Sequence, residues 1–468
     1  MKTTRRLSIT FITLFIITAC AANLLPEWTL IATSDTSGSN SRMFVDSDDN
    51  IVQLFYDAEG FVTLSRYNAD GEELASVTLE GFRDQPFDEH PASERLGDGL
   101  LIYTPNYTSG LSLVKVNKDF SVAWQLENVI PAAVADDLDI RLIDLVTDPS
   151  GQRFTVAFAQ YYVDGSGGGD LFIMEFSSTG QVINQAQFPL VDYERMTAMN
   201  YVADGLMVAA KASSSTTSQV RIFDSELVLS AELQLGEEVN AGGNYVAVLE
   251  RDPEQSLVLY DSSLTELWRA QVYPSATQRD RFDSIVMTDS NIYVMGSNNG
   301  ATDKSAQLLV KAFDYDGNLL WAYEPESELS ATLLLVGRVL RVNPLAITET
   351  NDGHVVVSYS HIKDITGANI EDADNDMIEI DIKESSHYSY RHVFLNQEGT
   401  EVNKALEPTY EIHELCPFGS IQPVCTVEKV VPGTRFLIDT AAVADSGFVV
   451  LSQQRGYEAA YRVQLSRY

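Results

Sequence analysis

The residues best suited to chemistry lie close together in the last third of the chain. An acidic run carries Asp372, Asp374 and Asp376 at alternate positions. Carboxylate oxygens with this spacing can converge on one cation, as the first three ligands of a calcium loop do. The rest of an EF-hand is missing, because Met377 stands where that loop needs glycine for its sharp turn. The run therefore predicts either a looser calcium site at the three aspartates or a solvated acidic loop.

The same region holds five of the six histidines, namely His354, His361, His387, His392 and His413. A transition-metal site needs two or three imidazoles to converge. His387 and His392 are five positions apart, so in a strand they would face opposite sides of the sheet. We therefore predict no cofactor, with calcium as the one candidate ion.

Linear signatures of hydrolases and nucleotide-binding proteins are missing from the sequence. There is no Gly-x-Ser-x-Gly elbow, no His-Glu-x-x-His helix and no phosphate-binding loop. The glycine-rich segment 165–169 has no helix pattern after it and reads as a flexible loop. We name no catalytic residue and expect a non-enzymatic protein.

The N-terminus has the pattern of an export signal. Residues 1–6 are basic, residues 7–17 are apolar, and the sequence Ile-Thr-Ala-Cys20 follows. This ending resembles the bacterial lipoprotein signal, in which small residues precede a cysteine that becomes the lipidated N-terminus. The resemblance implies cleavage of residues 1–20 and a lipid anchor on Cys20, followed by a tether over residues 21–26. An ordinary cleaved signal peptide is the alternative, and the apolar run is too short to span a bilayer.

The resemblance also implies a location. Ala21 and Ala22 follow the cysteine, whereas the enterobacterial family uses an aspartate there to retain lipoproteins at the inner membrane. We therefore expect an outer-membrane lipoprotein that faces the periplasm or the cell surface.

The other two cysteines suit the same compartment. Cys416 and Cys425 flank a loop that contains proline and glycine. In an oxidising periplasm such a pair predicts a local disulfide, because redox and metal sites need tighter spacing or more ligands.

The formal charge of −36 limits the partners. Such a surface repels nucleic acid and anionic headgroups, so partners are expected to be neutral, cationic or metal-bridged. The alternative is that the acidity serves solubility alone.

The elements that would position these residues are read from a repeat. All four tryptophans occupy one position in a repeated strand–turn–strand pattern, which defines a tryptophan column. Aligning the chain to this column gives eight positions at intervals mostly near those of four-stranded propeller blades: Trp28, Ala75, Trp124, Asn184, Ser230, Trp268, Trp321 and Asn403.

The sequence therefore predicts an all-β propeller over residues 27–468. We expect eight four-stranded antiparallel blades, or seven if one unit is an insertion, with further insertions around 361–390 and 406–435. The last repeat lacks a fourth strand, and residues 27–32 can supply it and close the ring.

The repeat resembles the quinoprotein-like (PQQ-type) propeller unit, of which Asp314-Tyr-Asp-Gly-Asn-Leu-Leu-Trp321 is the best copy. Together with the signal, it resembles BamB-type propeller lipoproteins of outer-membrane barrel assembly. The vicinal Cys-Cys pair that holds the quinone in the dehydrogenases is missing, so no quinone is expected.

Two functions follow from these patterns. The first is a monomeric, non-enzymatic lipoprotein that acts as a scaffold for an envelope protein partner. The alternative is a glycan- or peptide-binding or hydrolytic propeller with acidic residues at its central channel, with or without calcium. Dispersed sites of this kind leave no linear motif.

Overall fold

The protein is built from β-strands, as the computed structural model shows. The structure describes residues 28–34, 42–56, 61–83, 93–104, 111–130, 138–162, 169–190, 195–203, 205–211, 215, 217–236, 238–250, 254–273, 280–298, 307–325, 338–372, 378–406, 410–417, 426–430, 435–443, 447–455 and 461–467. Within these ranges no helix is long and apolar enough to cross a membrane.

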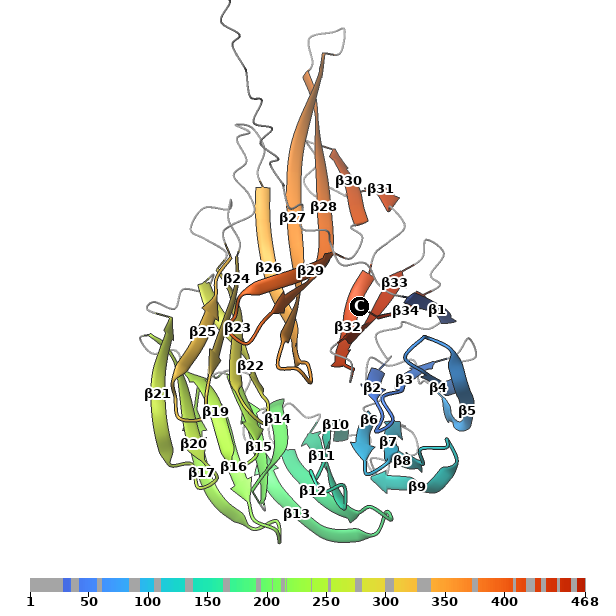
Figure 1. Cartoon of the computed structure of the whole chain (residues 1–468), viewed down its shortest axis with the longest axis vertical. Coiled ribbons are helices and arrows are strands. Elements are labelled where there is room, and N and C mark those ends of the chain that lie inside the picture. Colours follow the sequence, from blue (N-terminus) through green and yellow to red (C-terminus); the bar gives the residue numbers. More distant parts are fainter. Residues whose placement is uncertain are drawn as a thin grey trace, which may run out of the picture.

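The described strands form eight sheets, of which seven are four-stranded antiparallel blades (Figure 1). The first three blades in chain order are β2 (Arg42–Val45), β3 (Ile51–Tyr56), β4 (Phe61–Tyr67) and β5 (Glu73–Arg83); β6 (Ser93–Leu96), β7 (Gly99–Thr104), β8 (Leu111–Val116) and β9 (Val122–Ile130); and β10 (Leu138–Thr147), β11 (Arg153–Tyr162), β12 (Gly169–Ser177) and β13 (Val182–Leu190).

The next three blades are β14 (Arg195–Val202), β15 (Gly205–Lys211), β16 (Ser218–Phe223) and β17 (Leu229–Leu235); β18 (Glu238–Gly242), β19 (Tyr245–Glu250), β20 (Gln255–Asp261) and β21 (Glu266–Tyr273); and β22 (Asp280–Met287), β23 (Ile292–Asn298), β24 (Gln307–Phe313) and β25 (Leu319–Tyr323). In each blade consecutive strands pair, so the first strand is innermost and the fourth is outermost.

The last four-stranded blade joins the two ends of the described chain. It consists of β32 (Arg435–Ala442), β33 (Phe448–Arg455), β34 (Tyr461–Arg467) and, as its outer strand, β1 (Trp28–Ser34). Trp28 pairs with Arg467 and Ser34 with Tyr461. The N-terminal strand therefore completes the last blade, as predicted.

The remaining sheet is larger than a blade. It contains β26 (Arg338–Glu349), β27 (Val355–Asp372), β28 (Ile378–Leu395), β29 (Glu401–Leu406), β30 (Tyr410–Pro417) and β31 (Thr426–Val430). β29 pairs with one end of β28 and β30 with the other, and the long β27–β28 hairpin extends away from the ring (Figure 1). The expectation of eight four-stranded blades is therefore not supported, because seven sheets have four strands and this one has six.

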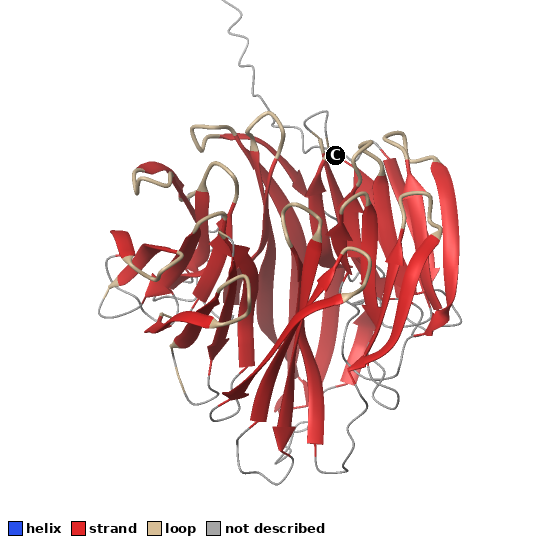
Figure 2. Ribbon diagram, turned by 90° about the horizontal axis from the view of Figure 1, so that it is seen from below, coloured by secondary structure: helices blue, strands red, loops and turns tan. Residues whose placement is uncertain are grey.

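The inner strands of neighbouring sheets contact one another around a central axis. β6, β10, β14, β18 and β22 meet in this order, and β32 contacts both β2 and β26. The view from below shows strands of the ring running side by side (Figure 2). This arrangement places one edge of every sheet at the middle of the molecule.

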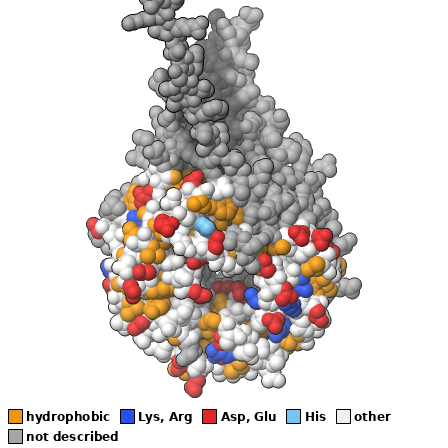
Figure 3. Space-filling view, in the orientation of Figure 1, with side chains coloured by type: hydrophobic (Ala, Val, Ile, Leu, Met, Phe, Trp, Pro, Cys, Tyr) orange, Lys and Arg blue, Asp and Glu red, His pale blue; other side chains and the backbone are white. Residues whose placement is uncertain are grey.

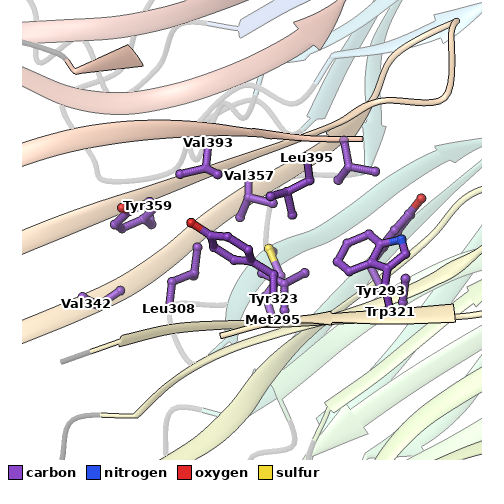
Figure 4. Close-up of a cluster of buried hydrophobic side chains, with 13 residues drawn as sticks. Tyr293, Met295, Leu308, Trp321, Tyr323, Val342, Val357, Tyr359, Val393 and Leu395 are labelled. Atoms are coloured by element: carbon purple, nitrogen blue, oxygen red, sulfur yellow. The ribbon is translucent and has the colours of Figure 1, made fainter. Parts of the chain in front are cut away.

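Apolar side chains between neighbouring sheets form the core. One cluster joins β23, β24 and β25 to β26, β27 and β28, with Tyr293, Met295 and Trp321 on one side and Val357 and Leu395 on the other (Figure 4). Burial of apolar surface on both faces of these strands explains their nearly continuous valine and leucine runs.

The tryptophan column has a clear packing role between blades. The indole of Trp124 lies against Gly180 in the next blade, Trp268 lies against Gly317, and Trp321 against Gly399. The three glycines have positive φ values of 80°, 86° and 73° in the turn before the outer strand. The indole Nε1 of Trp124 also donates to the Ser178 carbonyl at 3.0 Å.

Where the tryptophan is missing, the next blade fills the space from its own turn. Phe120, Leu227 and Leu264 occupy the position of those glycines, with φ of 66°, 59° and 58°. All three side chains are buried. Positive φ is unfavourable for such residues, so burial in the vacant space must offset the strain.

The register corrects one member of the column. Ala231 pairs with Ile222 just as Trp321 pairs with Ala312, and the extra residue of the β-bulge before it is Ser230. The column residue of that blade is therefore Ala231. The turn before it has Leu227 instead of glycine, and this removed the landmark that would have fixed the alignment.

Candidate functional site in the central channel

A cavity of about 370 Å³ opens at the inner edge of five consecutive sheets. Its polar lining comes from separate strands and is made of Glu94 of β6, Asp144 of β10, Thr197 and Asn200 of β14, Glu238 and Asn240 of β18, and Ser284 of β22. Figure 3 shows the hollow at the centre of the ring with acidic side chains beside it. The cavity is thus a concave, acidic site at the axis of the propeller.

Bulges in three of the inner strands, β10, β14 and β22, help to determine which side chains reach this cavity. The pairing of β10 with β11 shifts between Leu142 and Asp144, and that of β14 shifts between Met196 and Ala198. A bulge reverses the alternation of side chains along a strand and so re-aims the residues that follow it. Asp144 lies directly after such a bulge and lines the cavity.

Two carboxyl groups of the cavity, those of Glu94 and Asp144, have raised pKa values. Burial and, to a smaller extent, the nearby charge of Asp144 raise the pKa of Glu94 to about 7, although Arg42 opposes the change. Burial also raises the pKa of Asp144 to about 6, and the backbone N–H of Leu145, which donates to its Oδ1 at 2.9 Å, limits the rise. Both groups therefore titrate near neutral pH and would gain from a cation.

A chain of hydrogen bonds fixes the neighbouring carboxamides. Asn200 Nδ2 donates to Asn240 Oδ1 at 3.2 Å, and Asn240 Nδ2 donates to the Ile285 carbonyl at 2.9 Å. The backbone N–H of Ala241 also donates to Asn240 Oδ1, at 2.7 Å. This chain links β14, β18 and β22 and fixes the orientation of the two carboxamides.

The wall is rich in hydrogen-bond acceptors. No residue in the described ranges donates a hydrogen bond to the Glu94 carboxyl group or to Asn200 Oδ1, and Asp144 has a second carboxyl oxygen beyond the one bound by Leu145. Acceptors spread over a cavity of this size suit a ligand that brings several donors and a positive charge.

The residues predicted from the sequence lie elsewhere. Asp372 ends β27, whereas Asp374 and Asp376 fall outside the described residues, as do Cys20 and Cys425. Cys416 lies in β30, in a part where the structure describes the strand but not the side chains. The calcium loop, the lipid anchor and the disulfide therefore remain predictions.

The two histidines with described side chains have different environments. His392 is fully buried, and its Nδ1 lies 2.7 Å from Ser358 Oγ. His354 is partly exposed and pairs with Asp352 Oδ2 at 2.7 Å. No three metal-ligating side chains cluster within the described ranges.

Sequence reasoning named acidic residues at the channel as a class but did not identify Glu94 or Asp144. The sequence around each is an ordinary strand, and the two lie 50 positions apart in different blades (144 − 94). Their position in the repeat could have identified them, because each is an acidic residue in the first strand of its repeat, which lies innermost in the blade.

Comparison with known proteins finds only distant structural likenesses. No protein-family model and no curated sequence matches the chain. Solved structures that resemble it include a prolyl endopeptidase (10% identity, TM-score 0.43, covering 81% of this chain and 54% of that one) and a puromycin hydrolase (11%, 0.39, 69% and 50%). Drosophila plexin A, solved in complex with semaphorin 1b, also resembles it (10%, 0.38, 95% and 88%). The chain thus spans about half of the two hydrolase chains, and at these identities the likeness concerns the β-propeller fold alone.

Proposed function

We propose that this protein is a ligand-binding propeller whose central channel receives a positively charged organic group. The observation that carries the proposal is the cavity of about 370 Å³ with Glu94 and Asp144 in its wall. Burial makes the charged form of both carboxyl groups costly, as their raised pKa values indicate. A bound ammonium or guanidinium group would stabilise that charged form.

The chemistry of the wall favours a guanidinium or a polyamine over a compact ion. The acceptors of Glu94, Asp144 and Asn200 belong to three different blades and are distributed around the cavity. A planar guanidinium brings five N–H donors on a fixed frame, which can serve several acceptors at once. The basic side chain of a peptide or a free diamine has this chemistry.

Calorimetric titration with agmatine, a small molecule with one guanidinium and one ammonium group, tests the proposal. Wild-type protein should bind it, and the double variant Glu94→Gln/Asp144→Asn should bind about tenfold more weakly or worse, because two charged acceptors are lost. The matched control is Asp70→Asn/Glu72→Gln, which removes two exposed carboxylates from a turn outside the cavity. Equal affinity in the two double variants would show that binding follows net charge and not the channel.

A second function rests on the hairpin of β27 and β28. Each strand has 18 residues, and β30 and β31 extend the same sheet beyond the ring (Figure 1). We propose that this arm contacts an envelope protein, so that the propeller also acts as a scaffold. The test is to shorten the hairpin by residues 368–382 and crosslink intact cell envelopes. The account expects a partner that is recovered with the full chain and lost with the shortened one, while both retain the same melting temperature.

Two finer features complete the proposal. We propose that the six-stranded sheet takes the place of an eighth blade, supported by the contacts of β26 with β23 on one side and β32 on the other. We also propose that Cys20 carries the lipid and tethers the ring through β1 to the outer membrane, supported by the signal pattern in the sequence. We further propose that the repeat is quinoprotein-like, on the basis of the sequence Asp314-Tyr-Asp-Gly-Asn-Leu-Leu-Trp321.

A further inference from the structure

The outermost strands expose apolar side chains at one repeated position. Of the large hydrophobic residues that the described part of the chain exposes strongly, all but Leu345 lie on outer strands or directly before them. They gather near a β-bulge that recurs before each column residue, for example at Ile183 of β13 and Leu320 of β25. A bulge places consecutive side chains on one side of the strand, which explains their exposure.

These side chains are most numerous on two neighbouring blades. Exposed fractions are 51% for Val182, 47% for Ile183, 56% for Val228, and 39% for both Leu229 and Leu233. We call these five residues the β13–β17 surface. A single exposed hydrophobic residue is normal, whereas a group of five on adjacent edges indicates an interaction site.

One hydrogen bond ties the two halves of the surface together. Asn184 of β13 donates through Nδ2 to the carbonyl of Ser225 at 3.0 Å, in the turn that leads to Val228 and β17. Among the described strands, β17 pairs only with β16, on its inner side, and no described strand covers its outer edge. The surface therefore joins an apolar group to an open strand edge.

The charges beside this surface are acidic. Asp224 and Glu226 are exposed in the turn between β16 and β17, and no described cation forms an ion pair with them. Glu232 of β17 is 41% exposed and contacts Arg221 at 2.9 Å. A second copy of this chain would bring the same carboxylates to the contact, and an anionic membrane would also bring negative charge. Both would be repelled by Asp224 and Glu226. Charge complementarity thus favours a basic occupant.

We propose that the β13–β17 surface docks an extended segment of another protein in which apolar side chains alternate with lysine or arginine. The apolar residues cover the five exposed side chains, the basic residues face Asp224 and Glu226, and the backbone runs along the open edge of β17. Strand addition of this kind takes affinity from the main chain and specificity from alternate side chains.

The test uses a fluorescent eight-residue peptide of alternating valine and lysine, with binding measured by fluorescence anisotropy. Leu229→Ser/Leu233→Ser should weaken binding about tenfold without any change in net charge, because it removes apolar contact area only. Val122→Ser on β9 removes a residue outside the surface that is 50% exposed, compared with 39% for Leu229 and Leu233, and should leave affinity unchanged. A peptide with glutamate in place of lysine should not bind. Equal loss in both variants, no loss, or no saturable binding would overturn the proposal.

Discussion

Glu94 shows how one side chain acquires unusual chemistry from its place in the ring. Glu94 is half-buried at the inner edge of β6, and Asp144 of the neighbouring strand β10 lines the same cavity. Burial, and then the charge of Asp144, raise its pKa to about 7. The same residue in an outer strand would be an ordinary surface carboxylate.

A pH-dependent loss of stability follows from that pKa. Because the folded-state pKa of about 7 exceeds the ordinary value of 4.5, the folded protein binds the proton more tightly than the unfolded chain between these values. The free energy of unfolding should therefore fall as pH rises through this window. Glu94→Gln should be more stable than wild type at pH 8, by about 1 kcal/mol after allowance for solvent in the cavity. Urea unfolding at pH 8 and pH 4.5 checks this, and an equal difference at both pH values would contradict it.

At the scale of the element, the outer turn and the column residue of the preceding blade behave as one unit. A tryptophan meets glycine in three described pairs, whereas Ala75, Asn184 and Ala231 precede the turns with Phe120, Leu227 and Leu264. In each of these six interfaces a large side chain fills the space, either from the outer strand of one blade or from the turn of the next. The space between blades thus has a fixed volume that either partner can supply.

Exchanging one kind of pair for the other should reveal this coupling. Trp268→Ala should destabilise the protein by about 3 kcal/mol, because it empties the space on Gly317. Gly317→Leu should also destabilise, since its Cβ would lie 2.8 Å from the Trp268 ring. The double variant Trp268→Ala/Gly317→Leu reproduces the natural Ala231 and Leu264 pair. Its loss of stability should be about 1–3 kcal/mol smaller than the sum of the losses in the two single variants. Additive losses in chemical denaturation would show that the two positions are independent.

These elements also show how much of the fold and of the channel site could be predicted from the sequence. The tryptophan column located the repeats because each indole marks an outer strand, and its one-residue error at Ser230 arose in a blade that lacks both tryptophan and turn glycine. The six-stranded sheet could not be foreseen, since β29 and β30 both pair with β28 and no local pattern records that sharing. The channel carboxylates were equally hidden, because the bulge before Asp144 decides its direction.

At the scale of the whole molecule, closure depends on a strand from the other end of the chain. β1 pairs along its full length with β34, so the two ends of the described chain hold the ring together. Without β1 the last blade would have three strands, and the edge of β34 that β1 covers would be exposed.

Removal of residues 1–34 should therefore weaken the entire ring. We expect the melting temperature to fall by about 5 °C or more, with aggregation through the exposed edge of β34. A synthetic peptide of residues 26–36 should restore the melting temperature by pairing with that edge. An unchanged melting temperature in the truncated chain would mean that β1 does not stabilise the ring.

A cation that binds the carboxyl groups of the channel should displace protons from them, and this proton release can be measured. At pH 6 a large share of Glu94 and Asp144 should be protonated, given pKa values of about 7 and 6. A bound cation lowers both pKa values and expels protons into the buffer. Titrating agmatine by calorimetry in two buffers with different heats of ionisation measures this release. We predict a buffer-dependent heat that disappears in Glu94→Gln/Asp144→Asn, whereas a heat independent of buffer in the wild-type protein would contradict cation binding at these carboxyl groups.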